Sequence, residues 1–216
     1  MTEIKSNNFI KRFLSAIFFV PIIIIPLLLK SYYLPIVYLL ILSLIISEIF
    51  EMEKSTSRKS YLFIYLIITL ITFFLFLTLI ITETINAKLI IEIIFVIWIF
   101  DTFSYLGGNL FKGKKLMPKI SKGKTYSGLI TGIIVTSIIS FIYILCYKNS
   151  ILQLYYIPIF IIFLSFIGDL IASFLKRISG LKDSGNLIPG HGGVLDRMDS
   201  FIFVFLFVSI FMIFYQ

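Results

Sequence analysis

The stretch GDLIASFLKRISGLKDSGNLIPGHGGVLDRMDS, residues 168–200, is the most polar part of an otherwise apolar chain. It contains four of the five aspartates, two of the four arginines and the only histidine, His191. Ionisable residues are costly to place inside a membrane, and those found in membrane-spanning segments usually belong to a functional site. We therefore expect the functional site of this protein to lie in residues 168–200.

The composition of the whole chain indicates a membrane protein. Hydrophobic residues make up 59% of the 216 residues, charged residues only 14%, and the mean hydropathy is +1.06. These values leave no room for a large soluble domain and predict an all-α, polytopic integral membrane protein. The single cysteine, Cys146, excludes an internal disulfide.

Seven segments are long and apolar enough to span a bilayer, which takes about 20 helical residues. They are residues 10–29, 33–50, 61–82, 89–106, 126–147, 152–175 and 198–215. The first run is too long for the core of a signal peptide, so we expect it to be retained as a span. We divide the chain into a scaffold of three spans, residues 1–86, and a catalytic region of four spans, residues 87–216.

Basic residues alternate strictly between the connections of these seven segments. Of the 19 Lys and Arg residues, 16 lie in the N-terminal tail and in the second, fourth and sixth connections. The positive-inside rule then places the N-terminus in the cytoplasm and Gln216 outside. The net charge of +8 is explained by this bias, so no nucleic-acid partner is expected. In this topology Asp101, Asp169 and Asp196 all approach the cytoplasmic side.

The spacing of several polar residues suggests how they act. Asp169, Ser173 and Lys176 are at i, i+4 and i+7, so they share one helix face. This face could be an internal pair with a snorkelling lysine. However, Lys176 lies roughly 10 Å along the helix axis from Asp169, so Asp169 needs another partner, for which a metal ion is suited. Asp196 and Asp199 could cap a helix N-terminus or bind Mg²⁺.

Two further segments have alternative interpretations. Four glycines surround Pro189 and His191, and they predict either a tight re-entrant loop or a backbone cradle for a triphosphate. The lysine-rich residues 112–124 could attract anionic lipids, or bind a lipid head group or pyrophosphate.

Residues 168–200 also resemble the signature of the phosphatidate cytidylyltransferases (CDP-diacylglycerol synthases). The resemblance rests on Ser173, Lys176-Arg177, Lys182-Asp183, Pro189, His191-Gly192-Gly193, Asp196-Arg197 and Asp199. Residues 101–128 are similar to the segment that precedes this signature in the family. The chain departs from the family pattern at Ala172, usually a glutamate, at Ser127, usually acidic or an amide, and at Lys122, usually a proline.

The resemblance implies an enzyme of the inner membrane that converts CTP and phosphatidate to CDP-diacylglycerol and pyrophosphate, with its site facing the cytoplasm. It implies a centre of two cations, Mg²⁺ and a second ion such as K⁺, and it leaves a homodimer open. The implied metal ligands are Asp169, Asp196 and Asp199, which with Lys176 are the implied catalytic residues. The implied substrate-binding residues are Asp101, Lys124, Ser173, Arg177, Lys182, Asp183, His191, Gly192, Gly193 and Arg197.

Other functions are compatible with parts of this pattern. A related CTP-dependent enzyme could use another lipid or a polyprenol as acceptor. A transporter would place its charges near the bilayer midplane between internal repeats, whereas here the polar residues lie toward one face and no repeat is visible. The CDP-alcohol phosphotransferases share some of this chemistry, but their aspartate-rich motif on a single pair of helices has no counterpart in the chain.

Overall fold

The computed structural model describes residues 25, 34–146, 156–188 and 192–214. Six helices in this part of the chain are long and apolar enough to cross a membrane. They are α2 (Leu34–Lys54), α3 (Lys59–Ile81), α4 (Ala87–Phe111), α5 (Tyr126–Cys146), α6 (Tyr156–Ile178) and α7 (Leu195–Phe214). The predicted helical, multi-pass fold is confirmed for these six segments. The expected span 10–29 lies outside the described residues, apart from Ile25.

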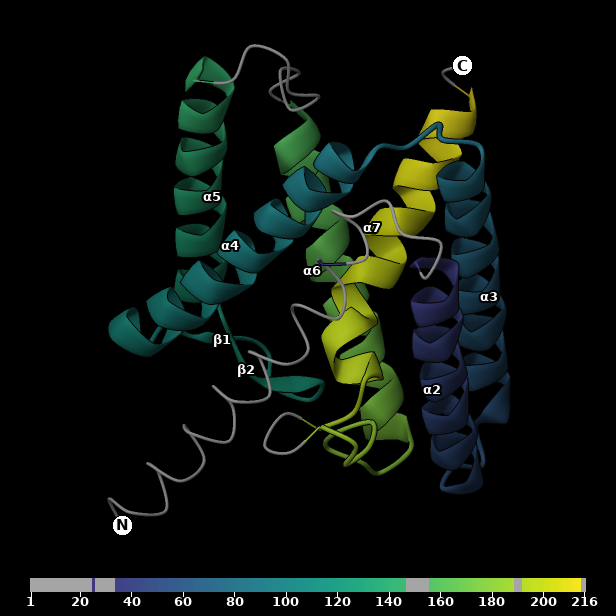
Figure 1. Cartoon of the computed structure of the whole chain (residues 1–216). Coiled ribbons are helices and arrows are strands. Elements are labelled where there is room, and N and C mark those ends of the chain that lie inside the picture. Colours follow the sequence, from purple (N-terminus) through teal and green to yellow (C-terminus); the bar gives the residue numbers. More distant parts are fainter. Residues whose placement is uncertain (1–24, 26–33, 147–155, 189–191, 215–216) are drawn as a thin grey trace.

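Helix α7 is at the centre of the bundle. It packs against α2, α3, α4 and α6, and half of its apolar span is buried inside the protein. In Figure 1, α2 and α3 lie on one side of α7, α5 and α6 lie on the other, and α4 crosses the bundle obliquely. The outer faces expose large apolar side chains such as Phe63, Phe74, Phe160 and Phe163, as expected for surfaces that face lipid.

Helix α4 runs five residues beyond the segment predicted from the sequence. Its first turn is capped by Asn86, whose side chain accepts a hydrogen bond from Leu89 N at 2.8 Å. The helix continues through Gly107 and Gly108 to Phe111, and these two glycines face α5. A Cβ at Gly107 would overlap the side chain of Thr131. Small residues thus let the two helices pack closely, as is common between membrane helices.

A short antiparallel hairpin joins α4 to α5, and the sequence analysis did not predict it. Its strands are β1 (Lys115–Met117) and β2 (Ser121–Thr125), with Lys115 opposite Thr125 and Met117 opposite Ser121. The turn is closed by a hydrogen bond from Ile120 N to Met117 O at 3.0 Å. Pro118 occupies the second position of this turn, where its fixed φ is favourable.

The basic connections gather at one end of the bundle. The α2–α3 connection, the hairpin and the loop between α6 and α7 lie at this end, and the C-terminus lies at the opposite end (Figure 1). This arrangement agrees with the alternation of charge in the sequence. We call this end of the bundle the basic end.

Candidate active site

Helices α6 and α7 meet closely where their aspartates lie. A Cβ at Gly168 would be 2.7 Å from the carbonyl oxygen of Asp199 and 3.2 Å from Ser200 Cα, so only a glycine allows this crossing. Asp169 follows directly on α6, and its carboxylate and that of Asp199 repel each other as like charges. Ser173 Oγ donates to Asp169 Oδ1 at 3.2 Å, which confirms that these residues share one helix face.

Lys176 is paired with Asp196 rather than with Asp169. Its Nζ lies 2.6 Å from Asp196 Oδ1, and the two side chains are only 10% and 7% exposed. The other carboxylate oxygen of Asp196 accepts backbone hydrogen bonds from Ser184 N and Gly193 N, both at 2.9 Å. The ammonium of Lys176 also interacts electrostatically with Asp199 and Asp169. One lysine therefore balances charge contributed by both helices.

The hairpin supplies a second lysine to the site. Lys124 Nζ lies 2.8 Å from Asp169 Oδ2 and 5.0 Å from the centre of the Phe166 ring, so it is both ion-paired and held over an aromatic face. The sequence led us to expect a metal ion as the partner of Asp169, and the structure pairs this carboxylate with a lysine of β2. Metal binding by Asp169 stays a prediction. This contact joins the hairpin to α6.

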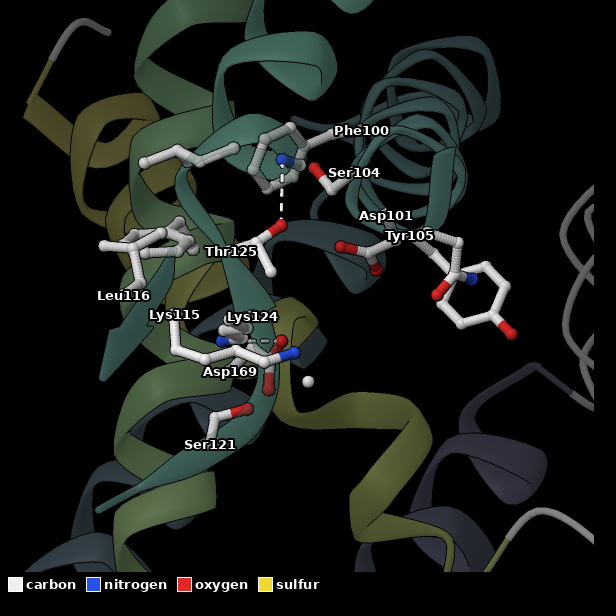
Figure 2. Close-up of a pocket in the computed structure, with 15 residues that line it drawn as sticks. Phe100, Asp101, Ser104, Tyr105, Lys115, Leu116, Ser121, Lys124, Thr125 and Asp169 are labelled. Carbon is white, nitrogen blue, oxygen red and sulfur yellow. Dashed lines mark hydrogen bonds and ion pairs between the residues drawn. The ribbon is translucent and has the colours of Figure 1, made fainter. Parts of the chain in front are cut away.

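A pocket of about 380 Å³ lies between α4, the hairpin, the start of α5 and α6. Figure 2 shows the Lys124–Asp169 pair in this pocket, with Asp101 and Tyr105 of α4 to one side of it. Electrostatic interactions link Asp101 with Asp169, Lys124 and Arg197. The other polar residues that line the pocket are Ser104, Asn109, Lys115, Ser121 and Thr125. Charges of both signs and several hydroxyl groups therefore line one hollow beside the α6 aspartate.

The glycine-containing loop between α6 and α7 is held by two carboxylates. Asp196 accepts from Ser184 N and Gly193 N as described, and Glu48 of α2 accepts from Val194 N at 2.7 Å and Leu195 N at 2.9 Å. These four N–H groups are already used inside the protein. Of the four glycines around Pro189 and His191, Gly193 thus donates its N–H to Asp196 inside the protein. The interpretation of the loop as a backbone cradle for a triphosphate otherwise stays a prediction.

The remaining residues of the signature are placed as follows. Arg177 is exposed, and it donates to Ile120 O at 3.0 Å and Leu181 O at 2.8 Å, which ties the hairpin turn to the end of α6. Lys182 and Asp183 are exposed in the loop, and Arg197 is exposed on the first turn of α7. Gly192 has a φ of +87°, a conformation that favours glycine. His191 lies outside the described residues. Substrate contacts of these residues stay predictions.

The donor groups of the site fit one mode of metal binding. Among the described residues, which exclude His191, no three His, Cys, Asp or Glu side chains form a cluster that could hold a metal ion by themselves. Mg²⁺ does not need such a cluster, because it is commonly held by one or two carboxylates, water and substrate phosphate oxygens. Asp169, Asp196 and Asp199 provide hard oxygen donors of this kind on two adjacent helices.

Two buried polar side chains near the site were missed in the sequence. Glu48 is 2% exposed, and an acid inside an apolar span is a signal that could have identified it. Tyr65 of α3 is also 2% exposed, and its hydroxyl has no hydrogen-bond partner among the described residues. The charges of Asp199, Asp169 and Asp196 act on this tyrosine. No local pattern distinguishes Tyr65 from the lipid-facing aromatic residues of its span.

Together these features define a multi-pass membrane protein with a site of paired acids and lysines at the basic end of its bundle. Comparison with known proteins gives the family. Residues 53–215 match the family described as the Cytidylyltransferase family. The chain belongs to this family, as its resemblance to the signature predicted.

Two relatives are similar over nearly the whole chain, and a third is similar over little more than half of it. The phosphatidate cytidylyltransferase of Rickettsia felis is 38% identical over 94% of this chain and 93% of its own length. That of Rickettsia conorii is 35% identical over 92% of this chain and 88% of its own length. That of Haemophilus influenzae is 41% identical over 58% of this chain, a match that covers 46% of its own length.

Proposed function

We propose that this chain transfers a cytidylyl group from CTP to phosphatidate, which forms CDP-diacylglycerol and releases pyrophosphate. The observation that carries this proposal is the similarity to phosphatidate cytidylyltransferases over more than nine-tenths of the chain. The site is compatible with such a reaction, because it places lysines and carboxylates beside a pocket at the basic end of a membrane bundle.

The reaction requires two anions to approach each other. A phosphate oxygen of phosphatidate attacks the α-phosphorus of CTP, a new P–O bond forms, and the bond between the α-phosphorus and the leaving pyrophosphate breaks. Phosphoryl and nucleotidyl transfers of this kind depend chiefly on positioning and on neutralising negative charge. Lys124 and Lys176 are the ammonium groups placed to contribute, since each is already held against an aspartate of the site.

The charge of the site favours an added cation. Four carboxylates, those of Asp101, Asp169, Asp196 and Asp199, interact with three bases, Lys124, Lys176 and Arg197. The carboxylates of Asp101, Asp169 and Asp199 repel one another, and a bound cation would relieve this repulsion. We propose that Asp169, Asp196 and Asp199 hold Mg²⁺, with a second cation such as K⁺. When bound, the ion supplies positive charge to the phosphates and the leaving pyrophosphate.

Roles of the protein groups follow from their contacts. Ser173 fixes Asp169 through its hydroxyl, and the two backbone bonds to Asp196 fix that carboxylate beside Lys176. The pocket beside Asp101 is where we place part of the substrate. Its hydroxyl groups and the ammonium of Lys115 are suited to a phosphate or a sugar.

The orientation is a further part of the proposal. We place the basic end of the bundle in the cytoplasm and the protein in the inner membrane. This arrangement is supported by the 16 of 19 basic residues that lie in alternate connections. Soluble CTP and the head group of a membrane lipid would then meet at the same surface.

The decisive experiment is the incorporation of radiolabelled CTP into lipid by the purified protein. Vesicles that contain phosphatidate should yield labelled lipid and an equivalent amount of pyrophosphate, whereas vesicles with another phospholipid or a polyprenyl phosphate should not. Asp169→Asn should abolish labelling, and Glu51→Gln, a change at an exposed residue of α2, should retain it. Labelling of another acceptor in preference to phosphatidate would replace the proposed substrate. No labelling of any lipid would refute the proposed function.

A further inference from the structure

Glu48 is a buried carboxylate in the part of the chain that precedes the family signature. It lies near the C-terminal end of α2 and is 2% exposed. Its Oε2 accepts from Ser184 Oγ at 2.7 Å and from Leu195 N at 2.9 Å, and its Oε1 accepts from Val194 N at 2.7 Å. Every one of these partners is an N–H or O–H group of the loop between α6 and α7 or of the first residue of α7.

Asp196 holds the same loop at two points, Ser184 and Gly193. Ser184 donates its backbone N–H to Asp196 and its hydroxyl to Glu48, while Gly193 N donates to Asp196. Ser184 therefore connects the two carboxylates. The contact is close, because a Cβ at Gly193 would overlap both Ser184 Oγ and Glu48 Oε2. Neither carboxylate can shift without disturbing the groups that hold the other.

The start of α7 is a favourable place for the carboxylate of Glu48. Val194 and Leu195 lie at the start of α7, where the first N–H groups of a helix have no partner within it. These groups carry the positive end of the helix dipole, so an anion is favoured there. Hydrogen bonds to a carboxylate are shorter and about twice as strong as neutral ones. Glu48 is placed to supply this anion from a different helix.

We infer that Glu48 is a positioning residue of the active site. It fixes residues 184 and 193–195, and through them it fixes the carboxylate of Asp196 against Lys176. The three hydrogen bonds of Glu48 go to Ser184, Val194 and Leu195 rather than to the aspartates on which the cation site is proposed to rest. Its part in catalysis rests on the proposed function, whereas its hold on the loop does not. Outer groups that orient metal ligands typically affect metal affinity or activity by about 10–100-fold.

A matched pair of substitutions tests this inference. Glu48→Gln keeps the size of the side chain and removes its charge, and the amide offers only one acceptor oxygen for three donors. Glu51→Gln makes the same chemical change three residues away on the same helix, at an exposed position. Both full-length variants and the wild type would be purified in the same detergent.

The first measurement is hydrogen–deuterium exchange, which needs no substrate. In Glu48→Gln the amides of Val194 and Leu195 should exchange at least about tenfold faster, and those of Ser184 and Gly193 should follow, with the centre of α7 unchanged. The second measurement is the Mg²⁺ concentration for half-maximal activity, which should rise by about tenfold. A variant that merely folds less well would lower the maximal activity and leave this concentration unchanged. Glu51→Gln should match the wild type in both measurements.

The outcomes separate this inference from the proposed function. Unchanged exchange in Glu48→Gln would show that Glu48 does not hold the loop. Faster exchange with an unchanged Mg²⁺ requirement would overturn its positioning role. If Glu48→Gln does not accumulate, Ser184→Ala removes one of the same hydrogen bonds, and a wild-type result in both measurements would also overturn the inference. If wild-type protein labels no lipid, the proposed function and the positioning role in catalysis both fail, and the exchange data still decide the contact.

Discussion

Removal of the Lys176 ammonium is the sharpest test of how the site is built. Lys176→Met keeps an unbranched side chain of similar length and deletes only the charge. Asp196 Oδ1 then loses a partner at 2.6 Å while its side chain stays 7% exposed. The charges of Asp199 and Asp169, on which Lys176 also acts, lose the same compensation.

The expected size of the effect follows from this burial. Loss of one partner of a buried ion pair typically costs about 3–5 kcal/mol, because the other charge remains buried without compensation. At about 1.4 kcal/mol for each factor of ten, this corresponds to roughly 10²–10⁴-fold in an equilibrium constant or a rate. We expect Lys176→Met to lower the thermal unfolding temperature in detergent and to reduce lipid labelling from CTP by at least about 100-fold.

Two further variants distinguish a structural pair from a catalytic one. Lys54→Met removes an exposed lysine at the end of α2 and should change stability by no more than about 0.5 kcal/mol. The double variant Lys176→Met/Asp196→Asn removes both charges of the pair, so it should recover part of the stability lost in Lys176→Met. It should not recover activity, because Asp196 is proposed to hold Mg²⁺ and Lys176 to neutralise the phosphates. Wild-type turnover and an unchanged unfolding temperature in Lys176→Met would refute the reasoning and leave Lys176 a snorkelling membrane lysine.

Three other perturbations have definite expected results. Asp169→Asn should abolish labelling. The double variant Asp169→Asn/Asp196→Asn should be little worse, because the effects of residues that act as one unit are not additive. Mg²⁺-dependent activity that survives in Asp169→Asn would exclude Asp169 as a metal ligand. Gly168→Ala should lower the unfolding temperature, because the added Cβ would lie 2.7 Å from the carbonyl oxygen of Asp199. Gly123→Ala should not lower it, because a Cβ at Gly123 would have no atom within 4 Å. Equal unfolding temperatures of the two variants would refute the close crossing of α6 and α7. In a Cys146→Ser background, Lys115→Cys should be labelled from the cytoplasm and Lys148→Cys from the other side, and cytoplasmic labelling at both would break the predicted topology.

The sequence was most informative where a signal is local or depends on composition. The apolar runs predicted the six helices of the described part of the chain, because a backbone in lipid has to satisfy its own hydrogen bonds. The spacing of Asp169 and Ser173 predicted a shared helix face, and their hydroxyl–carboxylate contact confirms it. The same spacing correctly separated Asp169 from Lys176.

Features that depend on distant segments could not be predicted in this way. Lys176 is paired with Asp196, 20 residues away, and Glu48 with Val194, 146 residues away. Nothing in the sequence beside either residue specifies such a partner. The hairpin was missed for another reason. Its strands are only three and five residues long and rich in lysine, which obscures the alternation that usually marks a strand.

Each strong polar contact of the site joins different elements of the fold. Lys124 of β2 reaches Asp169 of α6, Lys176 of α6 reaches Asp196 of α7, and Glu48 of α2 reaches the start of α7. An unpaired charge in this setting is costly, so each contact also favours the packing of the two elements it joins. Assembly of the bundle and assembly of the site are therefore coupled. The division into a scaffold, residues 1–86, and a catalytic region stays a prediction, and Glu48 is one of the residues of the first part that bond to the second.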